Sequence, residues 1–214
     1  MTTDSSAQAR AKKIKVLIFD VDGVLTDGTL WFFPNPSQTQ SNSSTESEAK
    51  ADASGYEIVT VNRFEGKGFN AHDGVGMSLA RLGGLKLGII TKRVSEAVVL
   101  RARELRIHHV LLGQDNKLLA FDQILDAEKV SVEEVAYVGD DIIDLPVLRR
   151  CGLAISVPNG RREVREAAHY ITDHAGGCGA ARDAIEFILQ AQGKFERTLE
   201  TYLAESTSPE MRGN

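Results

Sequence analysis

The stretch that most constrains this chain is a short apolar run that leads directly into two carboxylates. Val16–Phe19 (VLIF) contains no polar residue, which is typical of a strand covered on both faces in a parallel sheet. Asp20 follows at the carboxyl end of this run, Asp22 comes two residues later, and Gly23 permits a tight turn. Open α/β sheets bind ligands at the carboxyl ends of their strands. Because adjacent carboxylates repel each other, the pair indicates a bound cation such as Mg²⁺, although Asp and Gly are also ordinary turn residues.

Composition favours a single soluble globular domain. The chain has 214 residues, of which 42% are hydrophobic, so it can bury a substantial core. A net charge of −5 argues against a nucleic-acid surface. No apolar run approaches the roughly 20 residues that a transmembrane helix needs. With only two cysteines and no apolar signal segment at the N-terminus, we expect a cytoplasmic protein without a membrane partner.

After the first strand, apolar strands alternate with helical patterns along most of the chain. Further core strands are expected at residues 85–90, 110–112, 135–138, 153–157 and 170–172. Helices are expected after the glycine-rich stretch 66–76 and at residues 95–105, 117–129 and 180–190. This alternation implies βαβ units with right-handed crossovers. The sequence therefore predicts an α/β fold with a doubly wound, mostly parallel sheet.

A β-hairpin appendage is expected between the first two core strands. Residues 30–33 are aromatic and strand-like, and residues 56–64 (YEIVTVNRF) alternate as an exposed antiparallel strand does. Residues 37–54 are almost wholly polar, so we expect a disordered insertion at the hairpin tip. The aromatic surface is larger than one hairpin can bury, which predicts an oligomer interface there.

The two ends of the chain are expected to lie outside the main domain. Residues 1–13 are polar and show no periodicity, so we expect a disordered tail. The domain itself would span residues 14–193. Residues 194–214 would form a C-terminal tail, whose apolar residues have helical spacing and suit either the core or a subunit contact.

Polar residues of complementary kinds follow four of the expected strands. Thr91 comes after the second core strand, Lys117 follows the third, and Asp140 follows the fourth. Because all strands of a parallel sheet end at one edge, these residues are expected to meet Asp20 and Asp22 there. A metal ion and a phosphoryl group would fit such a set of side chains.

This set of motifs resembles the haloacid dehalogenase superfamily of phosphohydrolases over nearly the whole chain. The four motifs are DVDG at residues 20–23, Thr91, Lys117 and GDDIID at residues 139–144. Each motif is common by itself, but four in order at strand ends are specific. The resemblance implies a Mg²⁺-dependent phosphomonoester hydrolase.

The resemblance also implies a role for each motif residue. Asp20 would attack phosphorus to form an aspartyl-phosphate, and Asp22 would act first as general acid and then as general base. Mg²⁺ would be held by Asp20, the backbone oxygen of Asp22 and Asp140. Thr91 would donate a hydrogen bond to a phosphoryl oxygen, and Lys117 would add a fixed positive charge.

Several of these motif residues also have simpler interpretations. Thr91 could cap the following helix, and Lys117 could be a solvated lysine in a first helical turn. Asp141 could interact with a helix dipole, which is the interpretation we favour for it. Asp144 could hold a metal-bound water or orient Lys117.

Within the superfamily, the chain is similar to the capless 3-deoxy-D-manno-octulosonate 8-phosphate phosphatases and their sialic-acid-phosphate relatives. The likeness is carried by FNAHDGVGM at 69–77, ITKR at 90–93, GQDNK at 113–117, AYVGDDIIDLPVL at 136–148 and AGGCGAAR at 175–182. Between Gly28 and Thr91 there is room only for a hairpin and one helix, so no large cap domain is expected. The resemblance implies a phosphorylated sugar-acid substrate of lipopolysaccharide precursor synthesis and a homotetramer that completes the site. Substrate contacts would come from Asp22, Asn70, Ala71, His72, Asp73, Gly74, Arg93, Arg101 and Lys117.

The chain departs from this group at three positions, and other functions remain open. His72 and Cys178 stand where the group has arginine, and Lys92 stands where it has glycine. Sialic-acid 9-phosphate hydrolysis and a non-catalytic scaffold used for binding are the alternatives. A dinucleotide site is disfavoured, because the GxGxxA pattern at residues 66–71 follows an amphipathic strand rather than a buried one.

Overall fold

The computed structural model describes residues 5–34, 50–51, 57–58 and 63–207. The chain divides into two compact units. The main unit comprises residues 1–29 and 68–214, and the smaller unit comprises residues 30–67. The first boundary falls just after the first expected strand-end motif, and the second falls near the start of the glycine-rich stretch, between residues 67 and 68.

The described residues of the main unit form a six-stranded parallel sheet in the order β10-β9-β8-β1-β6-β7. The strands are β1 (Val16–Phe19), β6 (Lys86–Ile90), β7 (His109–Leu111), β8 (Val135–Gly139), β9 (Leu153–Ser156) and β10 (Tyr170–Ile171). The chain starts in the middle of the sheet at β1, builds one side through β6 and β7, and then crosses to β8 on the other side. This order confirms the predicted doubly wound α/β fold.

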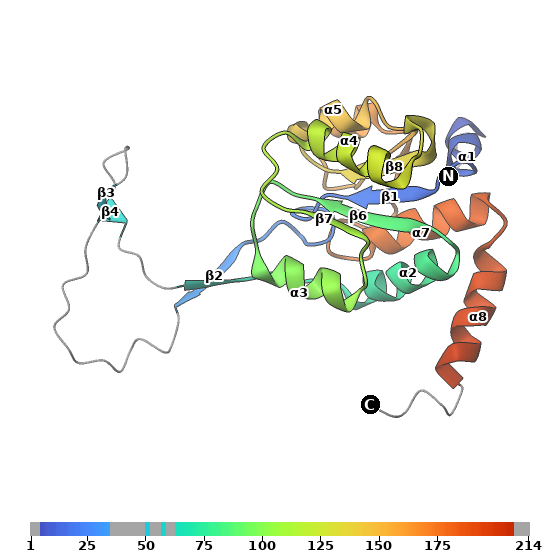
Figure 1. The fold of residues 1–214 in the computed structure, drawn as a ribbon, viewed down its shortest axis with the longest axis horizontal. Helices are drawn as coiled ribbons and strands as arrows, with labels where there is room; N and C mark the ends of the chain where they lie inside the picture. The colour runs from blue at the N-terminus through green and yellow to red at the C-terminus, as the bar shows by residue number, and fades with distance from the viewer. Residues whose placement is uncertain (1–4, 35–49, 52–56, 59–62, 208–214) are drawn as a thin grey trace. The chain divides into compact units, whose positions relative to one another are not determined.

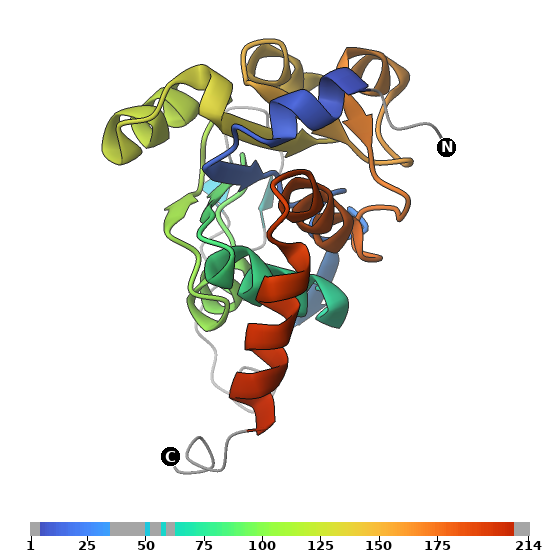
Figure 2. The same cartoon turned by 90° about the vertical axis from the view of Figure 1, so that its right-hand side faces the viewer.

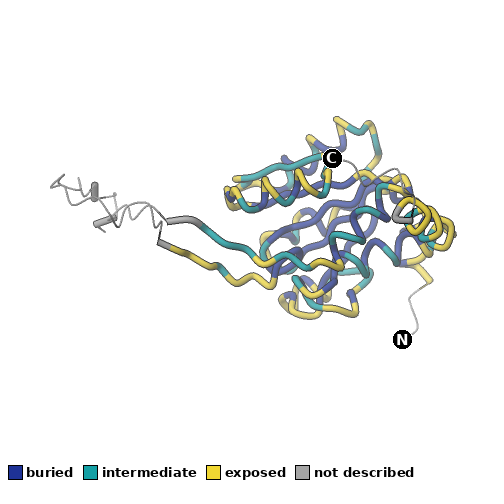
Figure 3. The backbone as a smooth tube through the Cα atoms, turned by 90° about the horizontal axis from the view of Figure 1, so that it is seen from below, coloured by how far each residue is buried: buried dark blue, intermediate teal, exposed yellow. Residues whose placement is uncertain are grey.

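Helices cover both faces of the sheet, as Figure 1 shows. The helices α2 (Ala71–Leu82), α3 (Glu96–Glu104) and α7 (Ala180–Ala191) supply the apolar cluster on one face. The helices α4 (Lys117–Glu128), α5 (Leu145–Leu148) and α6 (Arg162–Ala167) supply the cluster on the other face. Because both faces are covered, every residue of β1, β8 and β9 is buried, and the strands at the centre of this unit are dark blue in Figure 3.

The N-terminal segment differs from its expected disorder. Residues 5–11 form helix α1 (Ser5–Ala11), so the prediction of a disordered tail over residues 1–13 is wrong for this part. Ala7 and Ala11 lie four residues apart on one helix face and are buried in the core cluster that includes α7. Arg10 anchors the helix by donating a hydrogen bond from Nη1 to the carbonyl oxygen of Gly152 at 2.8 Å. The helix was not predicted because its buried residues are two alanines within an otherwise polar segment.

The C-terminal segment forms helix α8 (Phe195–Thr207), which follows α7 and packs against α2 and α7 (Figure 2). Phe195 and Tyr202 pack against the main core, whereas Leu203 is 54% exposed. One side of α8, which carries Phe195 and Tyr202, therefore packs against the core, which explains the helical spacing of the apolar residues in this segment. No helix among the described residues is long and apolar enough to span a membrane.

The smaller unit contains two short antiparallel ladders. The strand β2 (Trp31–Pro34) pairs with β5 (Arg63–Gly66), so the expected hairpin forms, with only the last residues of the expected second strand in the ladder. The strand β3 (Lys50–Ala51) pairs with β4 (Glu57–Ile58). Apart from β3, the expected disordered insertion 37–54 lies outside the described residues. Trp31 is 55% exposed and Phe32 is 50% exposed.

Candidate active site

The parallel sheet brings the expected polar residues to its carboxyl edge. Asp20 follows β1, Thr91 follows β6, and Asp140 follows β8, while Lys117 begins α4 after β7. These four strands are neighbours in the sheet order β8-β1-β6-β7. Asp20 and Lys117 are each only 4% exposed, and Thr91 is 2% exposed. The fold therefore buries ionisable groups side by side although they are far apart in the sequence.

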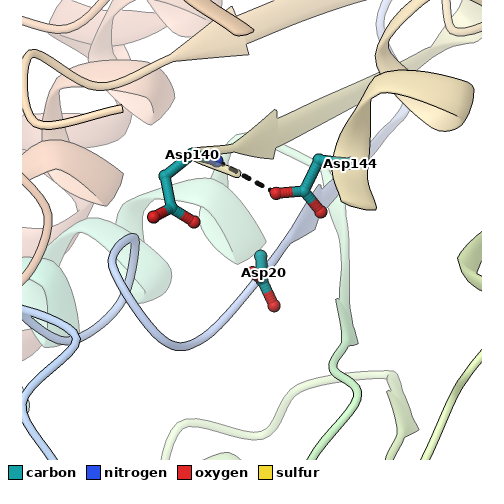
Figure 4. Close-up of side chains that lie close together, drawn as sticks. All are labelled: Asp20, Asp140 and Asp144. Carbon is teal, nitrogen blue, oxygen red and sulfur yellow. Dashed lines mark hydrogen bonds between the residues drawn. The ribbon is translucent and has the colours of Figure 1, made fainter. Parts of the chain in front are cut away.

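Three carboxylates lie together at this edge (Figure 4). Asp20, Asp140 and Asp144 each offer a carboxylate oxygen within 4.8 Å of the others. Burial, reinforced by the Asp20 and Asp144 carboxylates, raises the pKa of Asp140 to about 7. Burial also raises the pKa of Asp20, although the Lys117 ammonium opposes this effect. The cluster thus holds more negative charge than its protein surroundings neutralise.

The donor set of this cluster fits a divalent cation. One oxygen of Asp140, Oδ1, is buried and has no hydrogen-bond partner among the described residues. A buried carboxylate oxygen without a partner is costly unless it binds a cation. Carboxylate oxygens are the ligands that Mg²⁺ prefers in proteins, and an ion at this place would reverse the upward pKa shift of Asp140.

Lys117 links two of the acids. Its Nζ lies 2.9 Å from Asp20 Oδ1 and 2.7 Å from Asp144 Oδ1. Burial would lower the pKa of the ammonium, but Asp20 and Asp144 outweigh burial and hold that pKa above its usual value. A lysine at a helix N-terminus opposes the helix dipole, so these two carboxylates also compensate its position at the start of α4. Lys117 is therefore a buried, paired cation and not a solvated one.

Asp22, Thr91 and Arg93 form the neighbouring part of the edge. Arg93 Nε lies 3.4 Å from Asp22 Oδ2, and both side chains are partly exposed. Thr91 Oγ1 accepts a hydrogen bond from Arg93 N at 3.3 Å, while Ser95 occupies the N-cap position of α3. Thr91 thus shapes the turn after β6 and does not cap the helix. A threonine hydroxyl can also donate one hydrogen bond.

The expected substrate contacts around residue 72 lie in a second group of interactions. Asn70 caps α2 by accepting a hydrogen bond from His72 N at 2.8 Å. Asp73 is 4% exposed and accepts a hydrogen bond at 2.8 Å from Arg182 N in the first turn of α7. Arg101 pairs with Glu104 at 2.9 Å. These bonds of Asn70 and Arg101 lie within α2 and α3, and the Asp73 bond joins α2 to α7; none of the three reaches the acidic cluster.

Two further members of this group are small. Ala71 begins α2 and is exposed. Gly74 is a close-approach position, because a Cβ there would lie 2.8 Å from Arg101 Nη2. A larger residue at 74 would therefore displace the flexible Arg101 guanidinium.

Two residues of the site escape sequence reasoning. Asn159 donates from Nδ2 to Gly23 O at 2.9 Å and accepts from Gly176 N at 2.7 Å, so it connects the loop after β1 to the loop before α7. Its only sequence signal is its position in a PNG turn after an expected strand. Tyr137 lies inside β8 and donates from Oη to Asp144 Oδ1 at 2.7 Å. Nothing in the apolar run around it signals that bond.

A doubly wound sheet with a buried Asp–Lys pair and an acidic cluster that could hold a metal ion at its carboxyl edge is typical of hydrolases of the phosphoryl-transfer type. Residues 91–182 match the family model described as haloacid dehalogenase-like hydrolase. The chain belongs to this family, specifically to its 3-deoxy-D-manno-octulosonate 8-phosphate phosphatases. The phosphatase of that name from Escherichia coli (strain K12) is 37% identical over 88% of this chain and 86% of its own length.

Solved structures give the same result and include bound metals. The 3-deoxy-D-manno-octulosonate 8-phosphate phosphatase from Moraxella catarrhalis, in complex with magnesium, phosphate and a KDO molecule, is 35% identical with a TM-score of 0.74. The alignment covers 92% of this chain and 97% of that one. The cobalt-bound deoxy-D-mannose-octulosonate 8-phosphate phosphatase from Haemophilus influenzae is 30% identical with a TM-score of 0.71, covering 91% of this chain and 99% of that one.

Proposed function

We propose that this protein is a Mg²⁺-dependent phosphatase that hydrolyses 3-deoxy-D-manno-octulosonate 8-phosphate, a step of lipopolysaccharide precursor synthesis. The observation that carries the proposal is the buried cluster at the carboxyl edge of the sheet. There, Asp20 lies against Lys117, and its carboxylate comes within 4.8 Å of that of Asp140, whose Oδ1 has no hydrogen-bond partner among the described residues. A nucleophile, a fixed cation and a metal site meet at the edge where such folds bind ligands.

In the first half of the reaction, a carboxylate oxygen of Asp20 forms a bond to phosphorus. The bond between phosphorus and the sugar oxygen breaks, and Asp22 gives its proton to that oxygen. Arg93, 3.4 Å from Asp22, holds this carboxyl at the open side of the site. In the second half, Asp22 takes a proton from water as the water attacks the aspartyl-phosphate, which regenerates Asp20 and releases phosphate.

Positive charge and hydrogen-bond donors stabilise the transferring group. Lys117 supplies a fixed charge beside Asp20, and the Thr91 hydroxyl donates to a phosphoryl oxygen. Asp20, the backbone oxygen of Asp22 and Asp140 would hold Mg²⁺, which supplies positive charge that offsets the repulsion between the carboxylate and the anionic substrate. Asp20 at the centre of this set has its pKa raised by burial and becomes a competent anion only beside cations.

The relatives and the available cations support the substrate. A phosphorylated sugar acid carries a carboxylate and a phosphate, and Arg93 and Lys117 are cations placed at the same edge of the sheet. Asn70, Ala71, His72, Asp73, Gly74 and Arg101 remain proposed substrate contacts by family resemblance. Sialic-acid 9-phosphate is the second candidate, because His72 and Cys178 replace two arginines of the octulosonate group.

We also propose a cytoplasmic homotetramer. Trp31 and Phe32 expose about half of their surfaces on the smaller unit, and such aromatic side chains are typical of the core of subunit interfaces. Cys151 and Cys178 are both free thiols, as expected in a reducing compartment.

A substrate panel tests the proposed function. Phosphate release is measured with octulosonate 8-phosphate, sialate 9-phosphate and an aryl phosphate, with and without Mg²⁺. We expect Mg²⁺-dependent hydrolysis with the highest kcat/KM for the octulosonate ester. Asp20→Asn should lower kcat by at least about 1,000-fold, whereas Asp122→Asn, on the surface beside Arg150, should keep it.

The outcomes separate the parts of the proposal. A panel without a preferred sugar-acid phosphate would reject the substrate and keep the phosphatase. Full activity in Asp20→Asn would reject the covalent mechanism itself.

A further inference from the structure

Asp144 is a hydrogen-bond hub at the end of β8. Its Oδ1 accepts from Lys117 Nζ at 2.7 Å and from Tyr137 Oη at 2.7 Å. Its Oδ2 accepts from the backbone N–H groups of Asp140 at 3.0 Å and Asp141 at 3.2 Å. An ionised carboxylate has about four lone-pair sites. Four donors therefore occupy the Asp144 carboxylate fully, whereas Asp20, which also pairs with Lys117, keeps acceptor capacity.

The backbone is built to place this hub. Gly139 ends β8, and a Cβ at that position would lie 2.6 Å from the Cβ of Asp144. Only glycine therefore lets the Asp144 side chain fold back over the strand end. Asp144 is completely buried, so solvent cannot replace a lost donor.

Tyr137 supplies one of the four hydrogen bonds to the Asp144 carboxylate. It lies inside β8, is completely buried, and belongs to the apolar cluster on the α4 side of the sheet. Burial, with the Asp144 carboxylate adding to it, raises the pKa of the Tyr137 phenol well above its usual value. The phenol thus stays a donor at any working pH.

We propose that Tyr137 is a positioning residue for the phosphoryl-transfer reaction: its hydroxyl fixes the Asp144 carboxylate, which holds the Lys117 ammonium against Asp20. The proposal rests on the proposed function. Lys117 carries its charge on a flexible four-carbon stem, so the charge needs a fixed anchor to face the nucleophile. Preorganised charge stabilises a transition state because it needs no rearrangement at the moment of reaction.

A conservative substitution of Tyr137 tests whether its hydroxyl contributes to kcat. Tyr137→Phe keeps the ring and removes the donor. We expect kcat for an aryl phosphate to fall about 10-fold while KM stays within about twofold. Tyr170→Phe is the matched control. Tyr170 lies in the edge strand β10 of the same sheet and stacks on Phe187 of α7. It should retain wild-type kcat.

A double-mutant cycle separates positioning from general destabilisation. If Tyr137 acts through Lys117, Tyr137→Phe has no further effect on kcat in a Lys117→Ala background. If the two losses multiply, Tyr137 does not act through Lys117 and the proposal is wrong. Asp144→Asn provides a second route to the same hub and should show a similar loss of kcat.

A measurement that does not depend on catalysis tests the positioning role of Tyr137 separately from the proposed phosphatase function. Nitrogen-15 NMR of the lysine side chains reports the hydrogen exchange of the buried Lys117 ammonium. We expect a protected signal in the wild type and in Tyr170→Phe, and at least about 10-fold faster exchange in Tyr137→Phe. Equal protection in Tyr137→Phe would overturn the positioning role. If the wild type hydrolyses no phosphate ester, the proposed function fails, yet this signal still decides whether Tyr137 places Lys117.

Discussion

At the scale of single residues, burial and charge decide which strand-end acids are chemically special. The positions of Asp20, Thr91, Lys117 and Asp140 were predictable, because polar residues at the ends of parallel strands must share one edge. The bond from Lys117 to Asp144 was also foreseen, because orienting Lys117 is one of the two roles considered for Asp144. The bond that Asp144 accepts from Tyr137 and those that Asn159 makes were not, because they depend on tertiary geometry. Asp73 illustrates the limit: the sequence resemblance implies a substrate contact, and the structure gives its carboxylate a bond to the first turn of α7.

Asp73 makes stability depend on pH. Burial raises its pKa from 3.8 to about 6, although hydrogen bonds from the Arg182 and Ala181 backbones oppose the shift. Because the folded pKa is higher than the unfolded one, the contribution of Asp73 is present below about pH 4 and is lost as the pH rises to about 6. We expect the free energy of unfolding of the wild type, relative to Asp73→Asn, to fall by roughly 2–3 kcal/mol over this range.

Urea denaturation of both proteins at several pH values between 4 and 7 measures the difference. The comparison cancels the other titrating groups, since the two chains share them. A difference that stays constant with pH would show that the pKa of Asp73 is not raised.

At the scale of elements, the hydrophobic pattern was a good guide and small residues were not. The core strand β1 forms at residues 16–19 as predicted, because its run is wholly apolar. Helix α4 ends within one residue of its expected end, where Lys129 adopts a left-handed conformation. Helix α1 was missed because Ala7 and Ala11 give too weak an apolar signal. In the structure the helix packs against α7, and these two alanines belong to the same core cluster.

The glycine-rich loop before α7 is a second element whose role only the structure reveals. A Cβ at Gly176 would lie 1.8 Å from the carbonyl oxygen of Gly23, in the loop that carries Asp22. We expect Gly176→Ala to destabilise the protein by more than about 2 kcal/mol and to lower kcat, because the two loops must separate. Gly68→Ala is the control, since a Cβ there meets nothing within 4 Å.

Thermal unfolding and phosphate release measure both effects. Gly68→Ala should be neutral or slightly stabilising, because it mainly reduces the freedom of the unfolded chain. Equal stability of the two variants would contradict the close approach of the two loops.

At the scale of the whole molecule, the exposed aromatic side chains of β2 predict assembly. Trp31 is 55% exposed. Burying this large apolar side chain in a subunit interface would be favourable, because it removes apolar surface from water. We expect sedimentation velocity to give a tetramer for the wild type and smaller species for Trp31→Ser. Ile171→Ser, at a 41% exposed position of β10, is the control and should remain tetrameric. A monomeric wild type would refute the proposed assembly.

The most direct test of the account is whether Asp20 and Asp140 share one divalent ion. Mn²⁺ binding, followed by electron paramagnetic resonance of the free ion, reports the site without any substrate. We predict one tight site per chain in the wild type and in Asp122→Asn, and an affinity at least about 10-fold weaker in Asp20→Asn and in Asp140→Asn. Wild-type affinity in Asp140→Asn would contradict the account, because the two acids would then not act on one ion.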